Sequence, residues 1–170
     1  MQTKTIGLRR DYNIHMINVR NNILSQEELH CIQQTLYSSR FNWVEAQTNK
    51  QSFNSYYVHE FRHVNGIASP YDFLIHPLLD ALQPKAIIRV KANKYVQTPT
   101  LEQHEYHQDF PFKHKAAIFY VNTNNGQTQF VDTTVDSVEN SMLLFDASVE
   151  HRSTTTTDTP YRININFNYF

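Results

Sequence analysis

The last ten residues, YRININFNYF, constrain the fold more than any other stretch. Polar and apolar side chains alternate along them: Arg162, Asn164, Asn166 and Asn168 on one side, Ile163, Ile165, Phe167 and Tyr169 on the other. Because successive side chains of a strand point to opposite faces, the pattern predicts a strand with one apolar and one polar face. Solvation of the polar face is the commoner case in antiparallel sheets, but in a closed roll such a face lines a polar pocket.

Five further short runs, rich in β-branched and aromatic residues, precede this strand. They cover residues 85–96, 105–110, 115–123, 127–134 and 141–148. Turn-forming stretches such as NTNNG and TTTTDTP separate some of them. Many short strands at close spacing favour a sandwich or barrel over alternating strands and helices. The sequence therefore predicts a mainly β protein.

Two helices are predicted before the strands. In SQEELHCIQQTLYSS, Ser25 and Glu28 form a capping-box pattern, and Leu29, Ile32 and Leu36 recur at helical spacing. The second helix is expected within residues 69–82.

In that second stretch, SPYDFLIHPLLDAL, Ser69 is the expected cap and Pro70 suits a first turn. Pro77 lacks a backbone N–H, so a break is expected there.

Helices followed by strands in a chain of 170 residues indicate one domain, a double-stranded β-helix (jelly roll) with N-terminal supporting helices. We expect helices and outer strands in residues 1–84 and the jelly-roll core in residues 85–170. The polar, aromatic stretch 49–66 is either a lid facing the substrate or an ordinary outer strand.

Composition excludes several classes of site. The three glycines are far apart, so neither a dinucleotide-binding fingerprint nor a phosphate-binding P-loop can form. Cys31 is the only cysteine, which excludes a cysteine-based zinc site and an internal disulfide. The formal net charge is −1, so the chain lacks the excess of basic residues typical of nucleic-acid-binding proteins, and we do not expect nucleic acid as its main partner. With no long apolar run and no secretion signal, we expect a cytoplasmic protein that does not enter a membrane.

The stretch EYHQDFPFKHK contains the first candidate site residues, His107 and Asp109. Composition alone gives about 0.4 His-x-Asp triplets in such a chain, so the triplet is weak evidence. If the stretch is a strand, Glu105 shares the face of His107 and Asp109 and is an equally placed carboxylate.

A second histidine strengthens this metal hypothesis. His151 follows the apolar strand SMLLFDAS, and Arg162 begins the last strand eleven residues later. Two histidines and a carboxylate on one face of an octahedron form a triad that leaves three positions open on iron(II). A chelating 2-oxo acid and oxygen fill those positions, and a planar guanidinium such as that of Arg162 suits the acid's distant carboxylate.

The segments YHQDFP, AIFYVNTNNGQTQF, SMLLFDASVEHRS and YRININFNYF, which cover most of residues 86–170, carry a family resemblance. The chain resembles iron(II)/2-oxoglutarate-dependent oxygenases of the prolyl 4-hydroxylase-like branch. It is especially similar to short members found in tailed phages of marine cyanobacteria.

The resemblance implies roles for six residues. His107, Asp109 and His151 match the iron ligands, and Arg162 matches the residue that binds the C5 carboxylate of 2-oxoglutarate. Tyr120 matches a tyrosine that also binds the C5 carboxylate. Tyr95 resembles a tyrosine that lies near the oxoacid end of 2-oxoglutarate. Five other histidines are expected to be ordinary packing or surface residues: His59, His63, His76, His104 and His114.

The implied activity is hydroxylation of a C–H bond with iron(II), 2-oxoglutarate and O2, most simply on an amino-acid side chain such as proline in a peptide or protein. Asp109 favours hydroxylation, because related halogenases lack that carboxylate. Two alternatives stay open: a nucleic-acid demethylase of the same chemistry, and a non-enzymatic jelly-roll module of a phage particle.

Overall fold

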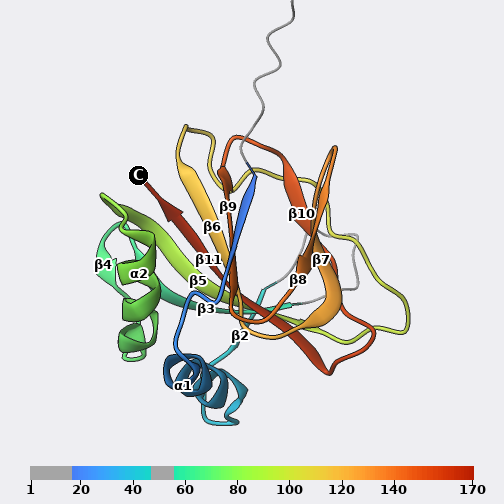
Figure 1. Cartoon of the computed structure of the whole chain (residues 1–170), viewed down its shortest axis with the longest axis horizontal. Helices are drawn as coiled ribbons and strands as arrows, with labels where there is room; N and C mark the ends of the chain where they lie inside the picture. Colours follow the sequence, from blue (N-terminus) through green and yellow to red (C-terminus); the bar gives the residue numbers. More distant parts are fainter. Residues whose placement is uncertain (1–16, 47–55) are drawn as a thin grey trace, which may run out of the picture.

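The computed structural model describes residues 17–46 and 56–170, which form two antiparallel sheets and two α-helices (Figure 1). The large sheet has the order β1-β9-β6-β11-β5-β3-β2, and β4 pairs with β3. Its strands are β1 (Asn18–Asn21), β2 (Val44–Ala46), β3 (Tyr56–His63), β4 (Gly66–Ile67), β5 (Ile87–Val96), β6 (Lys115–Tyr120), β9 (Ser141–Asp146) and β11 (Tyr161–Tyr169). The small sheet has the order β10-β7-β8, formed by β7 (Asn124–Phe130), β8 (Thr134–Ser137) and β10 (His151–Ser153).

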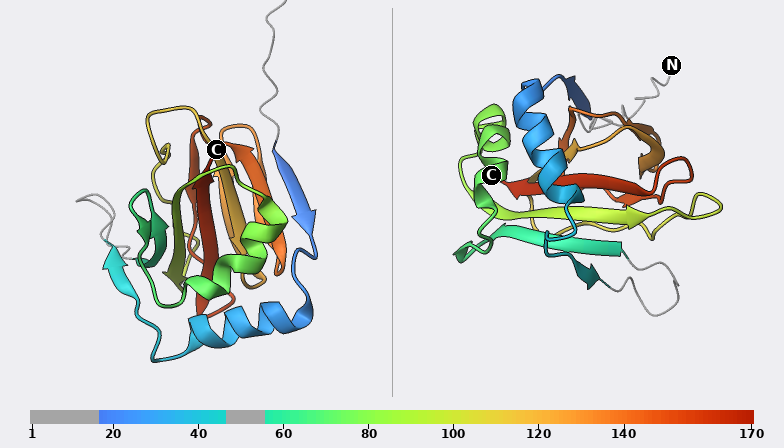
Figure 2. Two further views of the ribbon diagram at one scale, coloured as in Figure 1. Left: turned by 90° about the vertical axis from the view of Figure 1, so that its left-hand side faces the viewer. Right: turned by 90° about the horizontal axis from the view of Figure 1, so that it is seen from below.

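This architecture confirms the predicted mainly β jelly roll. The helices α1 (Gln26–Tyr37) and α2 (His76–Leu82) lie on the same face of the large sheet (Figure 2). The small sheet lies on its other face (Figure 1).

The alternation of β11 divides the interior of the protein in two. Ile163, Ile165 and Phe167 join an apolar core shared with the helices, to which α1 contributes Leu29 and Ile32. The polar side chains face the small sheet, and all four are buried: Arg162, Asn164, Asn166 and Asn168. The polar face of the last strand is therefore an inner wall and not a solvated surface.

Three local predictions need correction. Residues 105–110 do not form a strand, because they make only an isolated bridge between His107 and His151. The turn between β6 and β7 is shorter than the predicted NTNNG, because Asn124 already begins β7 and only residues 121–123 connect the two strands.

The second helix also begins later than predicted. A 3-10 turn, η1 (Asp72–Ile75), precedes α2, and no side chain caps η1. The break near Pro77 is confirmed, since that proline occupies the first turn of α2. Ser69 instead accepts hydrogen bonds from the Tyr71 amide, at 3.0 Å, and pairs with His59 at 2.7 Å.

The stretch proposed as lid or outer strand is a strand where the structure describes it. Tyr56–His63 is β3, paired between β2 and β5 inside the large sheet. Residues 49–55 lie outside the described ranges. In the described part of the chain, no helix has the length and apolar character needed to cross a membrane.

The capping box of α1 is present as predicted and gives a test of the fold. The Ser25 hydroxyl accepts from the Glu28 amide at 3.3 Å, and the Glu28 carboxylate accepts from the Ser25 amide at 2.9 Å. We expect Ser25→Ala to lower the free energy of unfolding by about 1 kcal/mol, measured by urea denaturation. Gln26→Ala, an exposed neighbour, is the control; equal losses in both variants would show that the cap is not the cause.

Candidate active site

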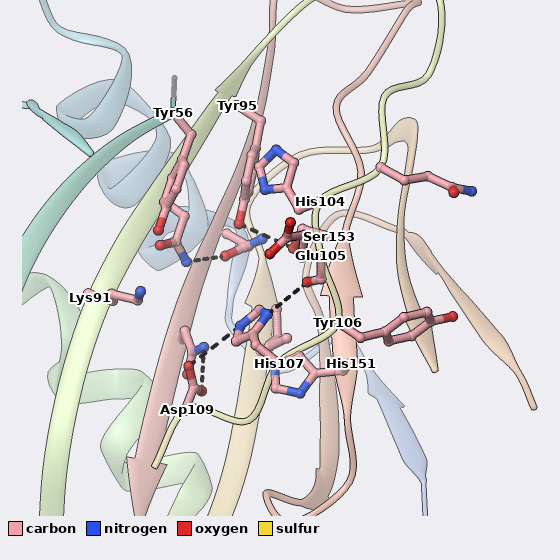
Figure 3. Close-up of a pocket in the computed structure, with 15 residues that line it drawn as sticks. Tyr56, Lys91, Tyr95, His104, Glu105, Tyr106, His107, Asp109, His151 and Ser153 are labelled. Atoms are coloured by element: carbon pink, nitrogen blue, oxygen red, sulfur yellow. Dashed lines mark hydrogen bonds and ion pairs between the residues drawn. The ribbon is translucent and has the colours of Figure 1, made fainter. Parts of the chain in front are cut away.

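A pocket of about 340 Å³ opens between the two sheets and the segment that joins β5 to β6 (Figure 3). Its walls are polar and aromatic, and most of the predicted site residues line it: Tyr95, His107, Asp109 and His151. Arg162 and Tyr120 lie behind this wall and are fully buried.

His107 and His151 are brought together by the backbone. Each donates its N–H to the carbonyl of the other, at 3.0 and 3.1 Å, so the two residues form an antiparallel bridge. Their ring centroids are 4.7 Å apart. The bridge fixes an otherwise irregular segment to the edge of β10 and places the two imidazoles side by side.

Hydrogen bonds also determine which ring nitrogen faces the pocket. Nδ1 of His107 lies 3.2 Å from the Glu105 carbonyl, and Nδ1 of His151 lies 3.2 Å from the Val149 carbonyl. A carbonyl only accepts, so each Nδ1 carries a proton, and in the neutral ring the lone pair that binds a ligand is on Nε2. Burial lowers the pKa of His151, which favours this neutral form.

Asp109 is held in one orientation by three donors. Its Oδ1 accepts from Arg89 at 3.1 Å, and its Oδ2 accepts from Asn166 at 3.1 Å and from Asn168 at 2.8 Å. Burial alone would raise the pKa of Asp109, but the Asn168 hydrogen bond and the charges of Lys91 and Arg89 outweigh it and hold the pKa below its ordinary value. The side chain is therefore an anion with a fixed direction.

These three residues could hold one metal ion. One ligand atom from each of His107, Asp109 and His151 lies within 4.8 Å of the others. Two neutral imidazoles and a carboxylate are the donors of the facial triad of non-haem iron(II) oxygenases. Glu105 lines the pocket but is not part of this group.

Arg162 is a fully buried cation with only neutral neighbours among the described residues. Its guanidinium donates to Ser137 at 2.8 Å, to Thr128 at 3.1 Å and to the Thr154 carbonyl at 3.5 Å. No ion pair of the described part involves it, and burial lowers its pKa. Leaving a buried charge without an opposite charge is costly, so this position suits an anionic ligand.

Two predicted tyrosines flank that guanidinium. The ring centroids of Tyr95 and Tyr120 lie 5.1 and 5.9 Å from the guanidinium carbon. Tyr120 donates its hydroxyl to Thr128 at 2.8 Å, and Tyr95 donates to Ser153 at 3.1 Å. Burial raises the pKa of Tyr120 to about 12, so its hydroxyl stays a donor.

His104, which was expected to be a packing or surface residue, packs against Tyr56 and Tyr95 in the pocket wall. His104 lines the pocket, and its buried Nε2 has no hydrogen-bond partner among the described residues. Burial and the nearby Arg162 charge lower its pKa to about 4, which keeps it neutral. Its segment is not a strand, so strand alternation does not set the direction of this side chain.

No protein-family model matches the sequence, and no curated protein matches it. Solved structures do match it over nearly the whole chain. One is an oxidoreductase of the 2OG-Fe(II) oxygenase family from Burkholderia pseudomallei, with 12% identity, 90% of this chain and 84% of that chain covered, and a TM-score of 0.66. The fold is that of the 2OG-Fe(II) oxygenases.

Two prolyl hydroxylases share this oxygenase fold. A viral collagen prolyl hydroxylase from Paramecium Bursaria Chlorella virus-1, solved with 2-oxoglutarate, is 11% identical, with 89% of this chain and 94% of that chain covered and a TM-score of 0.61. A prolyl hydroxylase from Trichoplax adhaerens, solved with a hypoxia inducible factor peptide, is 15% identical, with 93% and 84% covered and a TM-score of 0.67.

The ligand set generates a prediction about metal binding. We expect one divalent ion per chain, with binding lost in His107→Ala and His151→Ala and strongly weakened in Asp109→Ala. The affinity for iron(II) is measured by anaerobic calorimetric titration, and the stabilisation by the bound ion is measured by thermal unfolding. Glu105→Gln is the control, because the residue is nearby but outside the cluster; loss of the ion in that variant alone would show that the wrong carboxylate was chosen.

Gly126 generates a second prediction, because this residue of β7 lies directly against the Arg162 side chain. A Cβ at this position would meet the Arg162 Cδ and lie 2.6 Å from the Thr155 carbonyl oxygen, which is backbone and cannot easily move. We expect Gly126→Ala to displace the guanidinium and weaken 2-oxoglutarate binding by roughly tenfold, the loss of about one good hydrogen bond. Anaerobic titration checks this; iron(II) binding, which does not involve Arg162, should be unchanged.

Proposed function

We propose that the protein is an iron(II)- and 2-oxoglutarate-dependent dioxygenase that hydroxylates a C–H bond. The observation that carries the proposal is the pairing of two features in one site. A His/Asp/His cluster lines the pocket, and behind the pocket wall lies a buried arginine with no anionic partner in the described part of the chain. The hydroxyl and carbonyl acceptors around Arg162 leave its charge unbalanced, and the carboxylate of an oxoacid cosubstrate would balance it.

His107, Asp109 and His151 would hold the metal through two Nε2 atoms and one carboxylate oxygen. When bound, iron(II) with 2-oxoglutarate and oxygen supplies hydroxylating power towards unactivated C–H bonds, coupled to decarboxylation of 2-oxoglutarate to succinate. Arg89, Asn166 and Asn168 hold the carboxylate in place, and the protein orients and shields the reacting groups.

Arg162 would bind the C5 carboxylate of 2-oxoglutarate. Its hydrogen bonds to the hydroxyl oxygens of Ser137 and Thr128 hold the guanidinium in one orientation without neutralising its charge. Tyr120 is tied to the same Thr128 oxygen and adds a neutral donor beside the guanidinium. Tyr95 faces the pocket from β5 and would lie along the oxoacid.

We propose an amino-acid side chain as the group hydroxylated, with proline in a peptide or protein as the first substrate to test. The titles of the two prolyl hydroxylases with this fold support that choice. We further propose that the whole chain, residues 1–170, is one oxygenase domain, acting in the cytoplasm, or in that of an infected host cell if a phage encodes it.

The test separates an oxygenase from a generic metal protein. Loss of a hydrogen bond to a charged group should weaken 2-oxoglutarate binding by roughly 10- to 100-fold in Arg162→Ala. Arg162→Lys should fall between, because an ammonium keeps the charge without the fork. Tyr120→Phe should have a milder effect, because it removes one neutral donor. The readout is the visible charge-transfer band that forms when 2-oxoglutarate is added to the iron(II) protein without oxygen.

Iron(II) affinity is the internal control, since it should be equal in wild type and in all three variants. Equal 2-oxoglutarate affinity in wild type and Arg162→Ala would refute the cosubstrate role and favour a non-enzymatic jelly-roll module. Succinate release with peptide, free amino-acid and nucleic-acid pools then identifies the substrate pool, including the nucleic-acid alternative.

A further inference from the structure

The inner face of the large sheet carries a second cation, Lys91, at some distance from Arg162. The pairing of β5 with β11 sets the rows of this face: Tyr95 opposite Arg162, Asn93 opposite Asn164, Lys91 opposite Asn166, and Arg89 opposite Asn168. Four residues along a strand correspond to about 13 Å, so Lys91 lies beside the Asp109 end of the pocket. Figure 3 shows its side chain extending into the pocket near Asp109.

The charges of Asp109 and Glu60 act on Lys91, but Lys91 is bonded to neither. It makes no hydrogen bond or ion pair in the described part of the chain, although its side chain is half-buried. Asp109 already accepts from Arg89, Asn166 and Asn168. Glu60 is opposite Lys91 in the register with β3, but it is exposed and forms no ion pair with it. An ammonium in a pocket wall that is hydrogen-bonded to no acceptor suits a further anionic group.

Two unpaired acceptors flank this ammonium. The Oδ1 atoms of Asn93 and Asn166 are buried and have no hydrogen-bond partner among the described residues. Both Nδ2 atoms are already used, in bonds to Asn164 and Asp109, so flipping either amide would break a bond. Buried acceptors left unpaired are costly, and both line the pocket. The Asp109 end of the pocket therefore offers one positive donor and two acceptors.

We propose that the substrate presents a carboxylate to Lys91 and an N–H group to Asn93 and Asn166. This inference rests on the proposed function, and it narrows the substrate to an amino-acid derivative with an acidic group close to the reacting carbon. The carboxylate has two sources: the α-carboxylate of a free amino acid, or an acidic side chain next to the hydroxylated residue of a peptide.

Matched pairs of substrates test this chemistry. Wild type, Lys91→Met and Lys91→Arg are first loaded with iron(II) and 2-oxoglutarate without oxygen. Succinate release in air is then measured with each free L-amino acid and its amide, and with prolyl peptides that carry a neighbouring Glu or, in the partner peptide, Gln. We expect only the carboxylate member of a pair to raise release above the substrate-free rate, and the pair that responds identifies the source.

The variants give the size of the effect. We expect Lys91→Met to lower kcat/KM for the responding substrate by roughly 10- to 100-fold. Lys91→Arg, which keeps a positive charge, should retain part of the wild-type kcat/KM. Lys115→Met, which removes an exposed lysine outside the pocket, should behave as wild type. The charge-transfer band should be equal in all four proteins, because none of the variants replaces Arg162 or a metal ligand, and the hydrogen bonds that Asp109 accepts from Arg89, Asn166 and Asn168 remain.

Four outcomes would overturn the inference: equal stimulation by amides and acids, wild-type kinetics in Lys91→Met, a lower 2-oxoglutarate affinity in that variant, or no response to any acid. The third would assign Lys91 to the cosubstrate. A charge-transfer band missing from wild type would instead overturn the proposed function, so the two failures are distinguishable.

Discussion

The positive charge of Arg162, placed between two sheets, is the constraint that organises the interior. A guanidinium there needs hydrogen-bond acceptors on several sides, and β7 and β8 supply them through Thr128 and Ser137. It also needs room, which Gly126 leaves by lacking a side chain. The small sheet is therefore built around one side chain of the large sheet, and the space in front of it becomes the pocket.

The mutual backbone bonds of His107 and His151 have a comparable effect on the segment between β5 and β6. That segment, residues 97–114, has no regular strand and is held by isolated bridges to the chain around β10. One of these bridges lies at the two histidines themselves. The same two hydrogen bonds thus attach the segment to the small sheet and set the spacing of two ligands that are far apart in sequence.

The sequence predicted the parts of the site that follow from periodicity. The alternation of β11 was sufficient to predict a strand with a polar face, and the His/Asp/His cluster followed from residue types and a resemblance. The path of residues 105–110 was not predictable, because the pairing that holds it is long-range and an irregular segment has no period. The position of His104 in the pocket wall could not be predicted for the same reason.

Lys91 and Asn93 were missed although a signal was present. In IIRVKANKYV the polar residues Arg89, Lys91 and Asn93 alternate with the buried apolar residues Ile88, Val90 and Ala92. The same kind of alternation occurs in β11. The register that brings this face beside β11 came only from the structure.

This alternation has a consequence for how such a protein can change over evolutionary time. On β5 and β11, the side chains that pack with the helices alternate along the strand with the side chains that line the pocket. A substitution at position 91, 93 or 164 changes which polar groups the pocket presents to a ligand. It does not open a cavity in the apolar layer on the other face of the sheet. The scaffold can therefore acquire a new specificity by few mutations, each of which leaves the helix-facing core intact.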